Sequence, residues 1–132
     1  FGNSVAAVGS DRVLIGAPND DTGATNAGAA YLISTSGTLL TTFTNPTPAS
    51  NDYFGDSVAA LGSDRVLIGA YSDGAGAPGA GAAYLYNTNG TLLTPFTNPT
   101  PAVAAHRRCQ SPRPVCAVAQ TQDRRISFCL RV

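Results

Sequence analysis

The sequence contains no lysine, no glutamate and no methionine, and it has a single histidine among its 132 residues. A nucleophilic active site needs a base beside the nucleophile and a further group that orients the base. The one histidine, His106, lies outside the most regular part of the sequence. Asp20 and Asp21 are neighbours, so their side chains point apart on an extended segment, unlike the facing carboxylates of a glycosidase. We therefore expect no enzymatic activity.

Long apolar runs are also missing. No stretch approaches the roughly 18 consecutive apolar residues that a membrane-spanning helix requires, and no charged segment followed by an apolar one opens the chain. We therefore expect no membrane span. Because translation starts with methionine and none is present, we expect a processed product or a piece of a longer protein.

The zero net charge hides a division of the chain into two parts. Residues 1–102 carry seven Asp and two Arg, whereas residues 103–132 carry one Asp and six Arg, so the parts have net charges of about −5 and +5. All three cysteines and the histidine lie in the second part. This shift in composition predicts a boundary near Ala102.

The first part repeats itself. The opening stretch FGNSVAAVGSDRVLIGAP returns at residue 54 as FGDSVAALGSDRVLIGAY, and about three quarters of the forty-nine paired positions are identical. A period above fifty residues is typical of propellers and similar arrays, and two copies are too few for a closed ring. We therefore expect repeat units at 1–53 and 54–102, followed by a tail at 103–132.

Each unit has the pattern of four short strands. SVAAVG and RVLIGA flank a turn at Gly9-Ser10-Asp11, and GAAYLIST and TLLTTFT flank a second turn at Ser36-Gly37. Alanines along these strands favour close approach of neighbouring sheets, while Phe1, Tyr31 and Phe43 and their copies supply bulk. The predicted fold class is all-β: two tandem four-stranded antiparallel blades of an incomplete β-propeller.

These residues resemble a known family. Phe1-Gly2 followed by Gly16-Ala17-Pro18, with GAAYL further on, is similar to the FG-GAP repeat of the integrin α-subunit propeller and of many bacterial surface proteins. The second copy keeps Phe54-Gly55 and Gly69-Ala70 but has Tyr71 in place of the proline. The resemblance covers residues 1–102. It implies a secreted or cell-surface protein that mediates adhesion by binding a protein or glycan.

The calcium loop of that family, similar to D-x-D-x-D-G-x-x-D, is absent. The corresponding space holds only Gly9-Ser10-Asp11 and Gly62-Ser63-Asp64. Calcium takes six to eight oxygen ligands, which a three-residue turn with one carboxylate does not supply. We expect plain hairpin turns, no metal site and no cofactor, although the family includes calcium binders.

The long loops hold the candidate ligand-binding residues, which carry side-chain oxygens. These candidates are Asn19, Asp20, Asp21 and Asn26 in the first copy and Ser72 and Asp73 in the second. The loop differs most between the copies, and recognition often resides in loops on a rigid scaffold. The alternative is a solvated turn in which Asp bonds its own backbone. At the level of the protein, the alternative to binding is a structural spacer within a larger surface protein.

The sequence of the tail matches no recognisable binding module. Cys109, Cys116 and Cys129 lack zinc-site spacing, and the basic stretch HRRCQSPRP has few aromatic neighbours to stack bases, so we expect a poorly structured segment and no nucleic-acid binding. A third copy is due near residue 107, and its replacement suggests a change of reading frame. The segment RISFCLRV is expected to add loosely to a sheet edge. The uncovered blade faces are expected to contact neighbouring blades of a longer chain or to self-associate.

One further motif has two interpretations. Asn89-Gly90-Thr91 matches the N-glycosylation pattern, but it stands where a hairpin turn is required. The first copy has Ser36-Gly37-Thr38 at the same place and keeps the turn without the acceptor. We therefore expect a turn.

Overall fold

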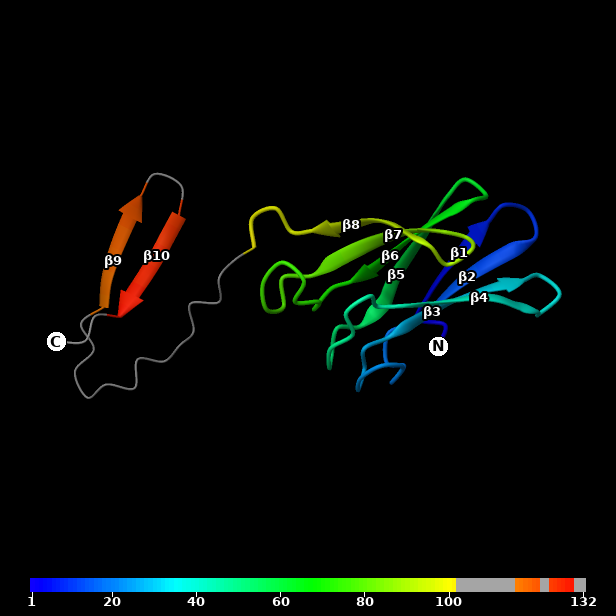
Figure 1. Cartoon of the computed structure of the whole chain (residues 1–132), viewed down its shortest axis with the longest axis horizontal. Helices are drawn as coiled ribbons and strands as arrows, with labels where there is room; N and C mark the ends of the chain where they lie inside the picture. The colour runs from blue at the N-terminus through cyan, green and yellow to red at the C-terminus, as the bar shows by residue number, and fades with distance from the viewer. Residues whose placement is uncertain (102–115, 122–123, 130–132) are drawn as a thin grey trace. The chain divides into compact units, whose positions relative to one another are not determined.

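Two four-stranded antiparallel sheets make up the repeat region of the computed structural model, which describes residues 1–101, 116–121 and 124–129 (Figure 1). The first sheet contains β1 (Ser4–Val8), β2 (Arg12–Ala17), β3 (Ala29–Ser34) and β4 (Leu39–Thr44). The second contains β5 (Phe54–Leu61), β6 (Arg65–Ala70), β7 (Ala82–Asn87) and β8 (Leu92–Thr97). Strands neighbouring in sequence are neighbours in each sheet. The prediction of one four-stranded blade per copy is confirmed.

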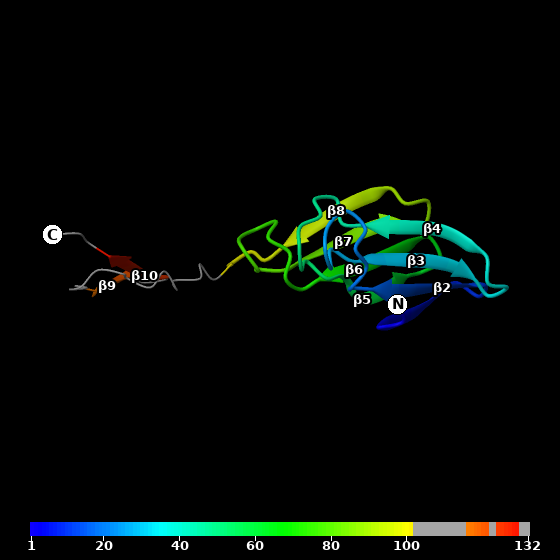
Figure 2. The same cartoon turned by 90° about the horizontal axis from the view of Figure 1, so that it is seen from below.

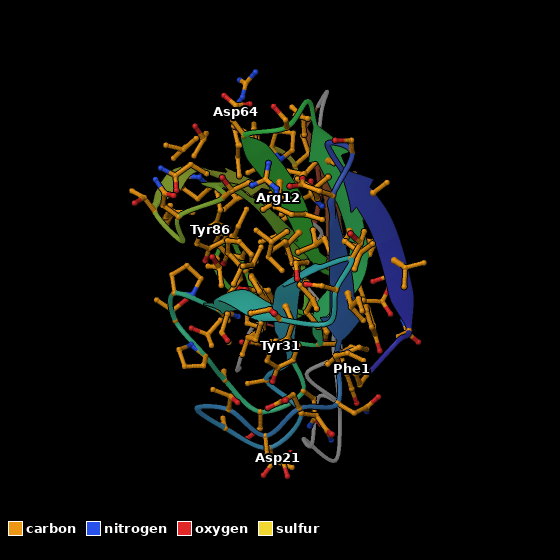
Figure 3. All side chains as sticks on the ribbon, turned by 90° about the vertical axis from the view of Figure 1, so that its right-hand side faces the viewer. Phe1, Arg12, Asp21, Tyr31, Asp64 and Tyr86 are labelled. Carbon is orange, nitrogen blue, oxygen red and sulfur yellow. The ribbon has the colours of Figure 1, made fainter. Side chains whose placement is uncertain are left out.

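The two ends of each blade differ. Tight turns join β1 to β2 and β3 to β4 in the first blade, and β5 to β6 and β7 to β8 in the second. Longer segments join β2 to β3, β4 to β5 and β6 to β7. We call the two ends the turn end and the loop end. The turn end comprises residues 9–11, 35–38, 62–64 and 88–91, and the loop end comprises residues 18–28, 45–53 and 71–81. Figure 3 shows Asp64 at the turn end and Asp21 at the loop end.

The hydrophobic core lies between the two blades, which stack face to face (Figure 2). From the first blade it takes Val8, Leu14, Ala30, Leu32 and Phe43, and from the second Phe54, Val66, Ile68, Ala70, Tyr84 and Tyr86. The rings of Phe43 and Tyr86 meet edge to face at a centroid distance of 5.3 Å. Because burying one such side chain stabilises by about 1.5–3 kcal/mol, this interface is the main source of stability for the pair.

Small residues bring the blades into backbone contact, as the sequence predicts. A Cβ atom on Gly16 would lie 2.0 Å from the carbonyl oxygen of Gly55 in the other blade. Phe54 N donates to Ala27 O at 2.9 Å, and Phe54 forms an isolated parallel bridge with Gly28. The second blade is therefore attached to the first by its opening strand β5, which begins three residues earlier in its repeat than β1 does.

The tail contains a β-hairpin. Its strands β9 (Cys116–Thr121) and β10 (Arg124–Cys129) pair with each other in a two-stranded antiparallel sheet. The strand β10, which covers most of the RISFCLRV segment, therefore pairs within the tail, and its addition to a sheet edge of the repeats stays a prediction. Pairing with a strand only two residues away closes a much shorter loop than docking on a distant edge does. The predictions for His106, Cys109 and the change of reading frame fall outside the described residues.

Candidate functional site

A chain of hydrogen-bonded side chains lines the loop end. Asn19 Nδ2 donates to Asn26 Oδ1 at 3.3 Å, and Asn26 Nδ2 donates to Asn51 Oδ1 at 3.1 Å. Tyr53 OH donates to the same Asn51 oxygen at 3.3 Å. The first two residues belong to the β2–β3 loop, and the others belong to the segment that joins the blades. We call these four residues the amide ladder.

The backbone under the ladder is unusual. Asn26, Asn51 and Tyr53 have φ values of 53°, 67° and 55°. Asparagine tolerates the left-handed region, but a bulky residue such as tyrosine rarely occupies it. Backbone bonds between the two segments hold it there, since Asn51 N donates to Thr25 O at 2.9 Å and Tyr53 N donates to Asn26 O at 3.1 Å. Strained residues held by their surroundings tend to cluster at binding sites.

An aromatic pair extends the ladder toward the second blade. The rings of Tyr53 and Tyr71 are stacked, with centroids 5.1 Å apart and planes inclined by 6°. Tyr71 is 60% exposed, so the outer face of its ring is available to a ligand. Tyrosine combines a flat apolar surface with a polar tip, which suits it to recognition surfaces.

Every charged residue at the loop end is an aspartate. Asp20 and Asp21 in its first segment are accessible, whereas Asp52 and Asp73 in the other two segments are buried. Both arginines of the repeat region directly follow the turn end, as the first residues of β2 and β6, and each is paired with the aspartate that precedes it in sequence. The loop end therefore favours neutral or positively charged ligands.

A second polar cluster is buried between the blades. Asn45 Nδ2 donates to Asp52 Oδ2 and to Asp73 Oδ2, both at 2.8 Å, and Tyr84 OH donates to Asp73 Oδ2 at 2.7 Å. All four residues are buried, with exposed fractions of 1–3%. The backbone NH groups of Ala49 and Ala75 complete the bonding of the two carboxylates. We call Asn45, Asp52, Asp73 and Tyr84 the polar latch, because it links the end of one blade to the loop of the next.

The latch perturbs its titratable groups. Burial raises the pKa of Asp52 above its ordinary value, and the charge of Asp73 adds to this, while the bond from Ala49 N acts in the opposite direction. Burial raises the pKa of the Tyr84 phenol too, assisted by the hydrogen bond to Asp73. Tyr84 therefore remains a neutral donor across the physiological range.

The first blade carries half of a latch at its open face. Tyr31 OH donates to Asp20 Oδ2 at 2.6 Å, matching the bond between Tyr84 and Asp73 one repeat later. Thr22 also bonds Asp20, and this bond, followed by the one from Tyr31, lowers the pKa of Asp20. Asp20 is thus an ionised acceptor.

The model of the FG-GAP repeat matches residues 1–33 and 41–86, which is more than half of the chain. The chain belongs to the FG-GAP repeat family. A search of the curated proteins finds no match. The first match lies within the first blade and the second runs from β4 through most of the second blade, so the family assignment and the stacked sheets agree on a β-propeller type of repeat domain.

The predicted loop residues of the FG-GAP units divide into three groups. Asn19, Asp21 and Asn26 lie together at the loop end, where Asp21 Oδ1 accepts from Asn26 N at 2.8 Å. Asp20 lies beside Tyr31 on the open face. Ser72 is half-buried next to Tyr71, and Asp73 is buried in the latch rather than displayed on the loop.

Sequence reasoning missed the residues contributed by the segment between the blades. These are Asn45, Asn51, Asp52 and Tyr53, together with Tyr71 and Tyr84. For the latch a signal existed: its Asn, Asp and Tyr are identical in both copies, and the Asp is kept at residues 20 and 73 although the residues on both sides of it change. The segment containing Asn51 and Tyr53 occurs once, so the repeat gives no such comparison.

The turns of the two blades are short, as predicted. Those at residues 9–11 and 62–64 connect adjacent strands directly. Within the part of the chain that the structure describes, no three His, Cys, Asp or Glu residues gather in a way that could hold a metal ion. The same residues include no helix of the length and apolarity needed to cross a membrane.

Proposed function

We propose that these FG-GAP blades are a non-catalytic binding module of a secreted or cell-surface protein. In this proposal the loop end recognises a protein or glycan partner and so mediates adhesion. The observation that carries it is the amide ladder with its stacked tyrosines, held on a strained backbone and exposed at one end of a rigid sheet pair.

The chemistry of the loop end narrows the partner. Asparagine side chains offer both donors and acceptors, and the free face of Tyr71 offers an apolar platform. Both suit the hydroxyl groups and apolar faces of sugars. Since the accessible charges there, Asp20 and Asp21, are negative, the proposal favours neutral glycans, or proteins with a basic surface, over sialylated or sulfated glycans.

The test is binding of the full chain to an array of neutral and acidic glycans and to a set of acidic and basic matrix proteins. For any ligand found, Tyr71→Ala is expected to weaken binding about tenfold, or ~1.4 kcal/mol. Leu39→Ala is the control, because Leu39 is 55% exposed at the opposite end of the blade. Equal losses for both variants, or a preference for acidic ligands, would contradict the proposal.

A spacer role is the second candidate. It is favoured by the loop of the second blade, where residues 74–81 consist only of glycine, alanine and proline. Such a loop offers little to a ligand. Absence of binding across both arrays would favour this role.

A further inference from the structure

The faces that the two blades turn away from each other have largely the same residues as the faces that they bury. Two positions differ, because Ile33 corresponds to Tyr86 and Leu61 corresponds to Val8. The outer face of the first blade, here called the leading face, corresponds to the buried face of the second. The outer face of the second blade, the trailing face, corresponds to the buried face of the first. The leading face comprises Phe1, Val5, Val13, Ile15, Asp20 and Tyr31, and the trailing face Leu67, Ala83, Leu85, Phe96 and Asn98.

Exposure separates the paired and unpaired versions of each face. Phe54 is fully buried, whereas its counterpart Phe1 is 75% exposed. Phe43 is 1% exposed, whereas its counterpart Phe96 is 48% exposed. The leucines of β4 and β8 behave differently: Leu40 and Leu93 are 47% and 46% exposed, so this position takes no part in packing between blades.

The leading face already has the geometry of a filled interface. The rings of Phe1 and Tyr31 are 5.8 Å apart and inclined by 49° (Figure 3). In the buried interface Phe54 and Tyr84 are 5.8 Å apart and inclined by 44°. A docking unit would therefore meet aromatic side chains that are already arranged for contact, which reduces the entropy lost on binding.

Three of the four latch positions recur on the outer faces, as Asp20, Tyr31 and Asn98, whereas the position of Asp52 corresponds to Ala105. Asp20 accepts a hydrogen bond from Tyr31 OH, as Asp73 accepts one from Tyr84 OH. Asn98 Oδ1 accepts from Thr100 N at 3.0 Å, as Asn45 Oδ1 accepts from Thr47 N at 3.0 Å. The Nδ2 group of Asn98 therefore corresponds to the Nδ2 group of Asn45, which donates to Asp73.

We propose that a second copy of this chain docks head to tail, with its trailing face on the leading face of the first. Asn98 of one copy donates to Asp20 of the next, while Phe96 of the former takes the position that Phe43 has within the chain, against Ile33 in place of Tyr86. Such a contact joins two different surfaces, so every oligomer still has one free leading face and one free trailing face. Further copies therefore add until the rotation between successive copies closes a ring. Propellers of four to eight blades would require roughly two to four copies.

The test is sedimentation velocity of the full chain from low to high micromolar concentration. We expect concentration-dependent oligomers. Phe96→Arg on the trailing face and Val5→Arg on the leading face should each abolish them, raising the dissociation constant at least about tenfold by placing an unpaired charge in a buried contact. Leu93→Arg should leave association unchanged, although it lies on the same strand as Phe96 with nearly the same exposure.

Mixing the two blocked variants distinguishes this head-to-tail contact from a symmetric contact between identical faces. The Phe96→Arg variant retains a free leading face and the Val5→Arg variant a free trailing face, so an equimolar mixture should form a one-to-one dimer and nothing larger. A monomeric wild-type chain at high micromolar concentration would overturn the proposal, as would oligomers that survive both substitutions or a mixture that stays monomeric. Circular dichroism of each variant confirms that it is folded.

Discussion

Replacing Asn45 by alanine tests the polar latch most sharply. The substitution removes both donor bonds to Asp52 and Asp73, each 2.8 Å long, and leaves two buried carboxylates facing each other without the amide between them. A hydrogen bond to a charged group contributes about 1.5–3 kcal/mol, and a buried group left without its partner costs a similar amount. Each carboxylate keeps one other donor to the same oxygen, so we expect a loss of about 2–4 kcal/mol in the free energy of unfolding.

The assay is urea and thermal unfolding at low micromolar concentration, followed by circular dichroism. A loss of ~3 kcal/mol lowers the midpoint of a domain this size by roughly 12–24 °C. Asn98→Ala is the matched control, because Asn98 occupies the same repeat position on the exposed trailing face. Its effect should stay within about 0.5 kcal/mol. Equal effects of the two substitutions would refute the latch as a source of stability.

Three other changes have defined outcomes. Gly16→Ala should destabilise by about 1–3 kcal/mol in chemical denaturation, because the new Cβ would overlap Gly55 O, whereas Gly74→Ala, whose Cβ would have its nearest neighbour at 3.8 Å, should not destabilise. The raised pKa of Asp52 means that the folded state binds the proton of this carboxyl more tightly than the unfolded state does. The contribution of Asp52 to the free energy of unfolding should therefore rise as the pH falls from above that pKa toward 3.8. The free energy of unfolding of Asp52→Asn should lack this pH dependence, and an unchanged dependence would show that Asp52 is not its source. Removing calcium with a chelator should lower the melting temperature by less than about 5 °C, equivalent to roughly 1 kcal/mol, and a larger drop would reveal a calcium site.

The strands were predictable because their signals are local. Apolar runs such as RVLIGA and the turns beside them place β2 and β6 at the residues observed, and the identity of the two copies confirms each assignment. The start of β5 was less predictable. Phe54 joins the strand through its contacts with Ala27 and Gly28 in the other blade, which no local pattern reveals.

The candidate site was predictable only in part, for the same reason. Asn19 and Asn26 belong to one loop, so composition alone selects them. Their partner Asn51 lies 25 residues beyond Asn26 and reaches it only after the chain has formed β3 and β4. The burial of Asp73 likewise depends on Asn45, which is 28 residues away in the preceding blade.

The claim that the loop end is the recognition surface is tested most directly by mapping amide chemical shifts. The isotopically labelled full chain is titrated with neutral oligosaccharides and, separately, with an arginine-rich peptide. The account predicts that perturbed amides cluster at Asn26, Asn51 and Tyr53, with none at Ser10 or Ser63. Perturbations confined to the turn end, or none with either probe at millimolar concentration, would contradict it.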